Sequence, residues 1–389
     1  MKSVAALWSM ALCGHWLCGS SLAFLPPSPL SSSPLHRLRA KHRPSATLRM
    51  AADQPMKVLL IGGSRFSGLY LWRELLDRGH DVTVFNRGKT ALRPIPGESA
   101  SEFERRKSST KFVTGDRKNL ADLRQVASMQ FDAIFDMNGR EVDETKMLVD
   151  LFPNRLKHYV YMSSAGVYLK SDEMPHREGD AVDPKCRHKG KLDSEEYLRS
   201  INAPWTSIRP TYIYGPLNYN PVEEYFFERL AQNRPVCIPG HGQHLTGLGH
   251  VRDLARQFAN VLGRPHAVGK TYNAGGLEAV TFDGVARLCA AAMGKDPSRV
   301  ELVHYNPKDL DFGKKKAFPF RPQHFFTSIE NAIRDLDWLP DYDNLEGLRD
   351  SYQNDFVIKQ REGKLKNDFE TDDIVLAAAK RDTRVPTLA

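Results

Sequence analysis

The sequence has few cysteines for its length. It contains five among 389 residues, and two of them, Cys13 and Cys18, lie near the N-terminus. The remaining three, Cys186, Cys237 and Cys289, are odd in number and widely spaced. This pattern excludes a disulfide framework, and it lacks the paired spacing that zinc sites use.

The sequence also lacks a long apolar run. The stretch over residues 4–18 is interrupted by Gly14 and His15, and it is too short to span a bilayer comfortably. We therefore expect no stable membrane span in the mature chain. Hydrophobic residues make up 41% of the sequence and charged residues 26%. This balance is typical of globular proteins and excludes a mainly disordered or collagen-like chain.

Acidic residues are absent from the first fifty positions. Six of the 55 Lys and Arg residues lie there, and none of the 47 Asp and Glu residues does, so the rest of the chain has 49 basic and 47 acidic residues. The formal charge of +8 is therefore weak evidence for a polyanionic partner. Any such argument depends on local patches of charge.

The acid-free segment has the composition of a targeting sequence. Residues 1–23 combine Lys2, an apolar stretch and the small residues around Ala23, as a signal peptide does. Residues 24–50 begin with Phe24 and are rich in Ser, Pro and Arg, as transit peptides are. Together they resemble the bipartite presequence of algae with complex, red-derived plastids, so we expect delivery to the plastid stroma. Plain secretion is the alternative, but it leaves the second segment unexplained.

From residue 56 the sequence alternates short apolar runs with amphipathic stretches. Such alternation predicts an α/β fold, with a doubly wound parallel Rossmann sheet over residues 56–216. The polar segment 91–109 is expected to be a loop insertion. Strands are expected at 57–61, 81–87, 111–115, 131–137, 158–163 and 206–213, and helices near 119–129, 141–152 and 190–201.

The second half of the sequence is less regular. Residues 217–361 predict a smaller C-terminal cap domain with segments that return to the sheet. Open α/β sheets bind ligands at their carboxyl edge, and we expect the cap to cover that edge. Residues 362–389 are expected to be a charged, partly mobile tail. Helices are expected at 222–233, 252–263, 281–293 and 328–336.

A glycine-rich loop follows the first expected strand. Gly62, Gly63 and Gly68 stand where a dinucleotide fold brings its first turn close to a pyrophosphate. Arg65 replaces the usual middle glycine and is followed by Phe66. The Arg65 side chain could add charge to a phosphate or narrow the groove, and the glycines could serve only to pack helix against strand. We favour some nucleotide affinity.

The end of the second strand carries cations where an NAD site carries an acid. Arg87 and Lys89 occupy this position, and two cations suit the 2′-phosphate of NADP better than the free hydroxyl of NAD. A solvated basic turn is the alternative. Asp116, at the end of the third strand, is expected near the adenine edge or as a helix cap.

Several motifs resemble a known family. The segments 62–68, 163–168 and 209–216 look like the extended short-chain dehydrogenase/epimerase fold. More specifically, the sequence resembles the chloroplast stem-loop-binding proteins of the b type over about residues 56 to 376. The closer match is carried by Asp183–Leu192, Gly215–Glu224, His304–Lys308 and Asp311–Arg321.

The resemblance also exposes one departure from an oxidoreductase. The superfamily places a Ser or Thr, a Tyr and a Lys around its cofactor, with the Tyr four positions before the Lys. Ser164 and Lys191 fit two of these catalytic positions, but Arg187 stands at the Tyr position. A guanidinium stays protonated and is a very poor general acid or base. Superfamily-type chemistry is therefore doubtful, and Ser164 and Lys191 have an altered or vestigial role.

Two basic segments are the candidate RNA-binding residues. Phosphates attract cations, and unpaired bases stack on aromatic rings. By composition alone, solvated basic turns anchored by Phe residues are the simpler explanation, but the resemblance implies stem-loop RNA as the ligand. The cations are Arg187, Lys189, Lys314, Lys315, Lys316 and Arg321, with His188 beside them and Phe312, Phe318, Phe320, Phe325 and Phe326 near the second group.

The resemblance further implies roles in plastid RNA stability, rRNA maturation or transcription. It implies contact with rRNA or ribosomal particles, homo- or hetero-oligomers with a related paralogue, and Mg²⁺-assisted RNA cleavage. Asp116, Asp136 and Glu141 could converge at the sheet edge, but they form no recognisable two-metal pattern. The competing hypothesis is an NADP-dependent epimerase, dehydratase or reductase acting on a nucleotide sugar. A third is an architectural subunit whose nucleotide site senses redox state.

Overall fold

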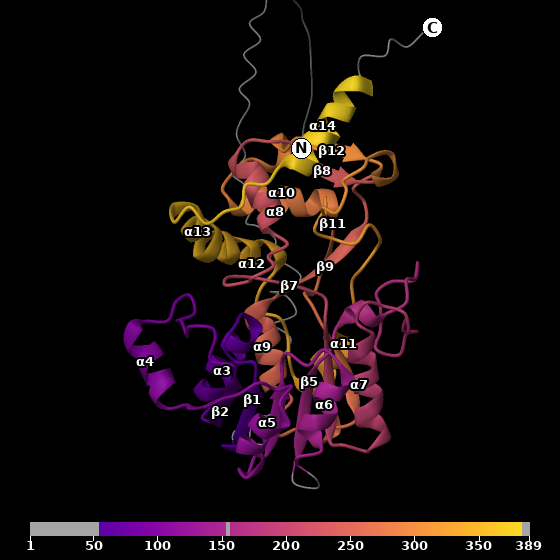
Figure 1. The fold of residues 1–389 in the computed structure, drawn as a ribbon. Helices are drawn as coiled ribbons and strands as arrows, with labels where there is room; N and C mark the ends of the chain where they lie inside the picture. Colours follow the sequence, from indigo (N-terminus) through magenta and orange to yellow (C-terminus); the bar gives the residue numbers. More distant parts are fainter. Residues whose placement is uncertain (1–53, 153–155, 383–389) are drawn as a thin grey trace, which may run out of the picture.

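A computed structural model describes residues 54–152 and 156–382 (Figure 1). Its main element is a seven-stranded sheet in which all paired strands are parallel. The strand order is β10-β6-β5-β4-β1-β2-β3, so the order reverses between β1 and β4. The strands are β1 (Lys57–Ile61), β2 (Asp81–Asn86), β3 (Lys111–Thr114), β4 (Ala133–Asp136), β5 (His158–Met162), β6 (Trp205–Pro210) and β10 (Lys270–Ala274). The predicted Rossmann-type α/β fold is confirmed.

Helices cover both faces of this sheet because alternate strand residues point to opposite sides. On β1, Val58 and Leu60 enter one core cluster, while Leu59 and Ile61 enter another. The first cluster lies under α3 (Ser67–Asp77), α9 (Val251–Ala259) and α11 (Glu330–Leu336). The second lies under α5 (Leu120–Ala127), α6 (Val142–Val149) and α7 (Lys189–Ser200).

The cap is a second layer with its own core. Figure 1 shows it above the carboxyl edge of the main sheet, with β7 and β9 running between the two parts. Its core packs around Phe226, Phe227 and Phe282. Its strands are β7 (Tyr212–Tyr214), β8 (Val236–Pro239), β9 (Leu245–His250), β11 (Ala279–Thr281) and β12 (Leu302–Tyr305). Its helices are α8 (Glu224–Ala231), α10 (Phe282–Ala292), α12 (Asn344–Ser351), a π-helical turn (Tyr352–Phe356) and α13 (Val357–Arg361).

The expected strand over 206–213 is wrong as a single element. The chain leaves the main sheet after Pro210, and Thr211 then donates its N–H to the Ala274 carbonyl at 2.9 Å. The following residues form β7 in a different, three-stranded sheet. Proline lacks an N–H donor and so marks a natural strand end.

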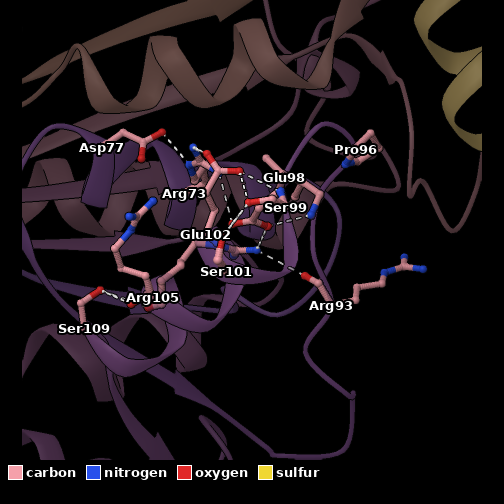
Figure 2. Close-up of polar contacts among 12 residues, drawn as sticks. Arg73, Asp77, Arg93, Pro96, Glu98, Ser99, Ser101, Glu102, Arg105 and Ser109 are labelled. Carbon is pink, nitrogen blue, oxygen red and sulfur yellow. Dashed lines mark hydrogen bonds and ion pairs between the residues drawn. The ribbon is translucent and has the colours of Figure 1, made fainter.

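The segment 91–109 is not a simple loop, because it contains the helix α4 (Ala100–Ser108). Ser99 and Glu102 form a capping box at its start, as Figure 2 shows. Arg106 lies in the interior, 3% exposed. Its guanidinium pairs with Glu98 at 2.6 Å and lies 3.9 Å from the Trp72 ring centroid. The charged composition of this segment favoured an exposed loop, but the buried Arg106–Glu98 ion pair anchors α4 to the rest of the domain.

The predicted tail is also more ordered than expected, because it forms α14 (Glu370–Asp382). Asp372 is 1% exposed and accepts hydrogen bonds from Arg229 of α8, at 3.0 Å to Oδ1 and 2.5 Å to Oδ2. This buried ion pair fixes the helix to the cap. The predicted presequence, residues 1–50, lies outside the described residues. Within 54–152 and 156–382, no helix is long and apolar enough to cross a membrane.

We expect Asp372→Ala to lower the free energy of unfolding by about 3–5 kcal/mol, because it leaves the buried Arg229 charge with only the more distant Glu228 carboxylate, at 3.8 Å. Asp373→Ala is the matched control. Asp373 pairs with Arg234, but its side chain is 64% exposed, so its loss should cost less than about 1 kcal/mol. Urea denaturation of both variants measures the difference. An equal loss of unfolding free energy in the two variants would contradict the role of Asp372 in fixing α14 to the cap.

Candidate functional site

A polar cleft of about 450 Å³ lies where the strand order reverses, at the carboxyl ends of β1, β2, β3 and β4. Open α/β sheets bind ligands at such switch points. Its volume lies within the range of small-molecule sites. Of the predicted cofactor-binding residues, it is lined by Gly62, Arg65, Arg87, Lys89 and Asp116.

The glycine loop folds as tightly as a phosphate-binding turn. Gly62 has φ of 94°, and a Cβ on Gly68 would lie 2.2 Å from the Gly62 carbonyl oxygen. A Cβ on Gly63 would lie 2.7 Å from Leu60. Side chains at these positions would push α3 away from β1. The predicted glycines therefore shape the turn. Gly62 lines the cleft, whereas Gly63 and Gly68 are not among its lining residues.

Arg65 does not fold down over the glycine turn. Its side chain is exposed, and its guanidinium carbon lies 4.4 Å from the ring centroid of Tyr219. Phe66 meets the same ring edge-on at 6.3 Å and has φ of 36°. Tyr219 is 62% exposed and lines the cleft. Arg65 and Tyr219 thus form a stacked pair at the opening of the cleft.

Asp116 closes a turn rather than capping a helix. Its carboxylate accepts the backbone N–H of Lys118 at 3.0 Å. The N-cap of α5 is Asn119, whose side chain accepts from Ala121. The capping alternative for Asp116 is therefore wrong, and Asp116 remains on the cleft wall.

The floor of the cleft contains an ion pair that the sequence analysis missed. Arg117 is 7% exposed and donates to both carboxylate oxygens of Asp136, one bond measuring 2.8 Å. Tyr159 also donates to Asp136, at 2.7 Å. Burial opposes ionisation of Asp136, but the Arg117 charge holds its pKa below the usual value. The cation immediately after Asp116 was the only sequence signal for this network.

Both carboxylate oxygens of Asp136 are therefore already occupied by hydrogen bonds from Arg117 and Tyr159. It does not converge with Asp116 and Glu141 on an open position, as the sequence had allowed. Over the described parts of the chain, no group of three or more His, Cys, Asp or Glu side chains could hold a metal ion.

Lys191 is bound to the backbone at the sheet edge. Its Nζ donates to the backbone carbonyls of Met162 at 2.6 Å and Gly139 at 3.1 Å. Burial lowers the pKa of this amine to about 8. Ser164 accepts the N–H of Gly166 at 3.1 Å and caps a short 3₁₀ turn. Both predicted catalytic residues thus have structural partners.

Two phenols near Lys191 and Ser164, those of Tyr161 and Tyr168, do not replace the missing tyrosine. Tyr161 shares the Gly139 carbonyl with Lys191, donating at 3.0 Å, but it is fully buried and burial raises its pKa. Tyr168 is 4% exposed and donates to Asn273 at 2.6 Å. Burial raises the pKa of Tyr168 to about 12. Neither hydroxyl suits proton transfer at neutral pH.

Cations from three segments meet beside these positions. We call Arg140, Arg187, Lys316 and Arg321 the cationic cluster. His188 lies among them. A Cβ on Gly166 would lie 2.6 Å from His188 and 2.8 Å from Arg321, so both pack on that glycine.

The positive charges of the cluster lower the pKa of groups that lie among them. Burial first, and then Arg187, Arg321, Lys191 and Arg140, lower the pKa of His188 to about 4. His188 is therefore neutral at pH 7, and its Nε2 accepts a hydrogen bond from Arg187 at 3.0 Å. Burial and the charges of Arg187 and Arg321 also lower the pKa of Lys316. Among described residues, no salt bridge joins a member of the cluster to a carboxylate.

The predicted RNA-binding residues are only partly brought together. Lys189 pairs with Asp193 at 2.5 Å. Lys315 pairs with Asp368 at 3.1 Å and with Glu370. Lys314 is exposed. The structure therefore joins Arg187 of the first segment to Lys316 and Arg321 of the second, while Lys189 and Lys315 are neutralised.

The proposed aromatic stacking next to Lys314–Lys316 is wrong for most of its residues. Phe318 is 6% exposed, Phe320 4% and Phe325 4%. Phe318 and Phe320 pack in the cap core, and Phe325 packs with Tyr168. These rings anchor the basic segment and cannot receive a base. The exposed ring at the site is Tyr219, which sequence analysis did not single out.

The sequence and the fold match known proteins. The model of the NAD dependent epimerase/dehydratase family matches residues 58–275, and the chain belongs to this family. An epimerase from Methanothermobacter thermautotrophicus has the same fold, with a TM-score of 0.65 at 19% identity over 82% of this chain and 98% of that one. A UDP-glucuronic acid 4-epimerase from Bacillus cereus with NAD gives a TM-score of 0.60 at 19% identity, covering 79% and 99%.

Within the family, the chain is a homologue of the chloroplast stem-loop binding protein of 41 kDa b of Arabidopsis thaliana. The two are 50% identical over 342 residues, which covers 87% of this chain and 89% of that protein. An uncharacterized UDP-glucose epimerase of Bacillus subtilis is 24% identical over 328 residues, 78% of this chain and 97% of that protein. The predicted family resemblance is confirmed.

We expect His188 to destabilise the fold in acid. Its native pKa of about 4 lies below the ordinary value near 6.5 of an unfolded histidine, so the native state binds fewer protons between these pH values. Stability then falls as pH drops from 6.5 to 4. Replacing His188→Asn should remove this part of the slope, so the variant gains stability relative to wild type on acidification. A pH-independent difference in urea denaturation would contradict the assignment.

Proposed function

We propose that the mature protein is a plastid RNA-binding protein that recognises stem-loop RNA through the cationic cluster. The observation that carries this proposal is the set of Arg140, Arg187, Lys316 and Arg321, whose side chains form no salt bridge with a carboxylate among the described residues. The name of the Arabidopsis thaliana homologue, a chloroplast stem-loop binding protein, supports the same ligand and the plastid location.

Unpaired cations held together reduce the stability of a fold unless an anion binds them. Phosphates of RNA would relieve this repulsion and release their own counterions. Arg187 and Arg321 carry planar guanidinium groups, which suit phosphate oxygens better than an ammonium does. The cluster therefore gives affinity for the RNA backbone, without sequence preference of its own.

Epimerase or dehydratase chemistry is not the function we propose. Arg187 replaces the expected phenol, and Lys191 is held by two carbonyls. We infer instead that RNA binding serves plastid RNA stability, rRNA maturation or transcription, in contact with rRNA or ribosomal particles and in oligomers with itself or a paralogue. We include Mg²⁺-assisted cleavage in the proposal only because the family resemblance implies it. No acidic cluster among the described residues supplies ligands for the metal ion.

Replacing Arg187→Gln together with Arg321→Gln should weaken binding of stem-loop RNA about ten- to a hundredfold at low salt. The slope of log affinity against log salt should become shallower by about one to two, because two phosphate contacts are lost. Filter binding of the mature protein at several salt concentrations measures both quantities.

The control variant combines Arg299→Gln with Lys364→Gln, which removes the same charge from exposed positions of the cap. Their side chains are 87% and 67% exposed. Equal loss in both double variants would mean that net charge, and not the cluster, binds RNA. Wild-type binding that ignores salt would refute the proposal itself.

A dinucleotide is a second ligand that the cleft favours. The close Gly62–Gly68 contact and the start of α3 fit a pyrophosphate, and Arg87 with Lys89 fit a 2′-phosphate. When bound, NADP supplies hydride-transfer chemistry in this family. In this chain Lys191 and Ser164 would at most orient the nicotinamide end, since the phenol next to Lys191, Tyr161, is fully buried.

We expect NADPH to raise the melting temperature more than NADH does, because only NADPH offers a phosphate to Arg87 and Lys89. The Arg87→Gln, Lys89→Gln variant should lose this preference while NADH binding stays similar. Differential scanning fluorimetry measures the shifts. Equal shifts for the two cofactors in the wild type would refute the assignment of these cations.

A further inference from the structure

We propose that unpaired loop nucleotides of the bound RNA enter the dinucleotide cleft and stack on Tyr219, so that RNA and dinucleotide compete for one site. This inference rests on the proposed RNA binding and specifies which part of the RNA the protein recognises.

The cleft and the cationic cluster are continuous. Arg140 lines the cleft, and its charge also acts on His188 and Lys191. Its backbone carbonyl abuts the first turn of α7, because a Cβ on Gly190 would lie 2.3 Å from it. Met162 also lines the cleft, and its carbonyl holds the Lys191 amine. A strand of RNA on the cluster would therefore lie next to the cleft, because Arg140 belongs to both.

Tyr219 supplies the aromatic face that such a strand requires. It is 62% exposed, whereas the rings beside Lys316 are buried. Arg65 lies against it at 4.4 Å, and Phe66 supports it edge-on. Bases stack on aromatic and guanidinium planes in single-stranded nucleic acid sites. An exposed tyrosine with an arginine partner at a cleft opening has this character.

The charge of the cleft also suits a strand of phosphates. Arg65, Arg87, Lys89 and Arg140 line it. No salt bridge within the described ranges joins any of the four to a carboxylate. By contrast, Lys118 on the same wall pairs with Glu144 at 3.1 Å. A funnel of unpaired cations leading to a stacking ring is the arrangement used to hold single strands.

A double-stranded stem would be excluded from this cleft. Its bases are already stacked and paired, so they cannot stack on Tyr219, and only its phosphates can contact the cluster. The stem and the loop would thus bind neighbouring parts of one surface. A dinucleotide in the cleft would displace the loop and leave the stem contacts in place.

The test measures binding of two RNAs to the mature protein by fluorescence anisotropy. One is a stem-loop, and the other is a blunt duplex with the same stem. Tyr219→Ala should weaken stem-loop binding about five- to a hundredfold, as loss of one stacked base does, and leave duplex binding unchanged. Tyr219→Phe should keep the stem-loop affinity. Ile358→Ala, which truncates a side chain of a residue that is 45% exposed on α13, is the control for loss of a surface apolar group.

NADPH provides the second arm of the test. At a concentration that saturates its thermal shift, it should raise the apparent Kd of the stem-loop at least fivefold and leave the duplex unaffected. Stem-loop binding that survives both Tyr219→Ala and saturating NADPH would overturn the inference but leave the proposed function intact. Absence of binding to either RNA would overturn the proposed function itself.

Discussion

The amine of Lys191 connects the elements on which the site depends. It joins the Gly139 carbonyl, after β4, to the Met162 carbonyl, at the end of β5. Because Lys191 lies in the first turn of α7, these two bonds fix the start of that helix against the sheet. Arg187 and His188 immediately precede α7, so their position follows from the same anchor. A residue at a catalytic position of the family thus also fixes the start of a helix.

The arrangement of charge differs from the distribution of charge in the sequence. Lys315 stands in a run of three lysines, yet two acidic residues of the C-terminal segment neutralise it. Arg140 stands alone in the sequence, yet it belongs to both the cleft and the cationic cluster. Ion pairs at exposed positions are weak, but they still remove a side chain from the set available to a ligand. A run of cations is therefore a poor measure of a binding surface.

Much of the main sheet could be predicted from the sequence. The apolar run at Lys57–Ile61 and the glycines after it follow directly from burial on two faces and from a tight turn. The start of α4 has a local signature in the Ser99–Glu102 capping box, which the sequence analysis missed, but the burial of Arg106 depends on Glu98 and Trp72 and has none. The same holds for Tyr219, whose exposure is decided by the fold and not by its neighbours in sequence. The positions of Ser164 and Lys191 were predictable, but their partners were not.

The C-terminal helix reaches back to the segment that carries Lys316 and Arg321. Asp372 fixes α14 to α8, and Asp368 and Glu370, at the start of that helix, tether Lys315. The position of the loop that carries Lys316 and Arg321 thus depends on a segment more than fifty positions downstream. Removal of α14 together with Asp368 would therefore free Lys315 and loosen this loop, although neither Lys316 nor Arg321 contacts the helix through a salt bridge among the described residues.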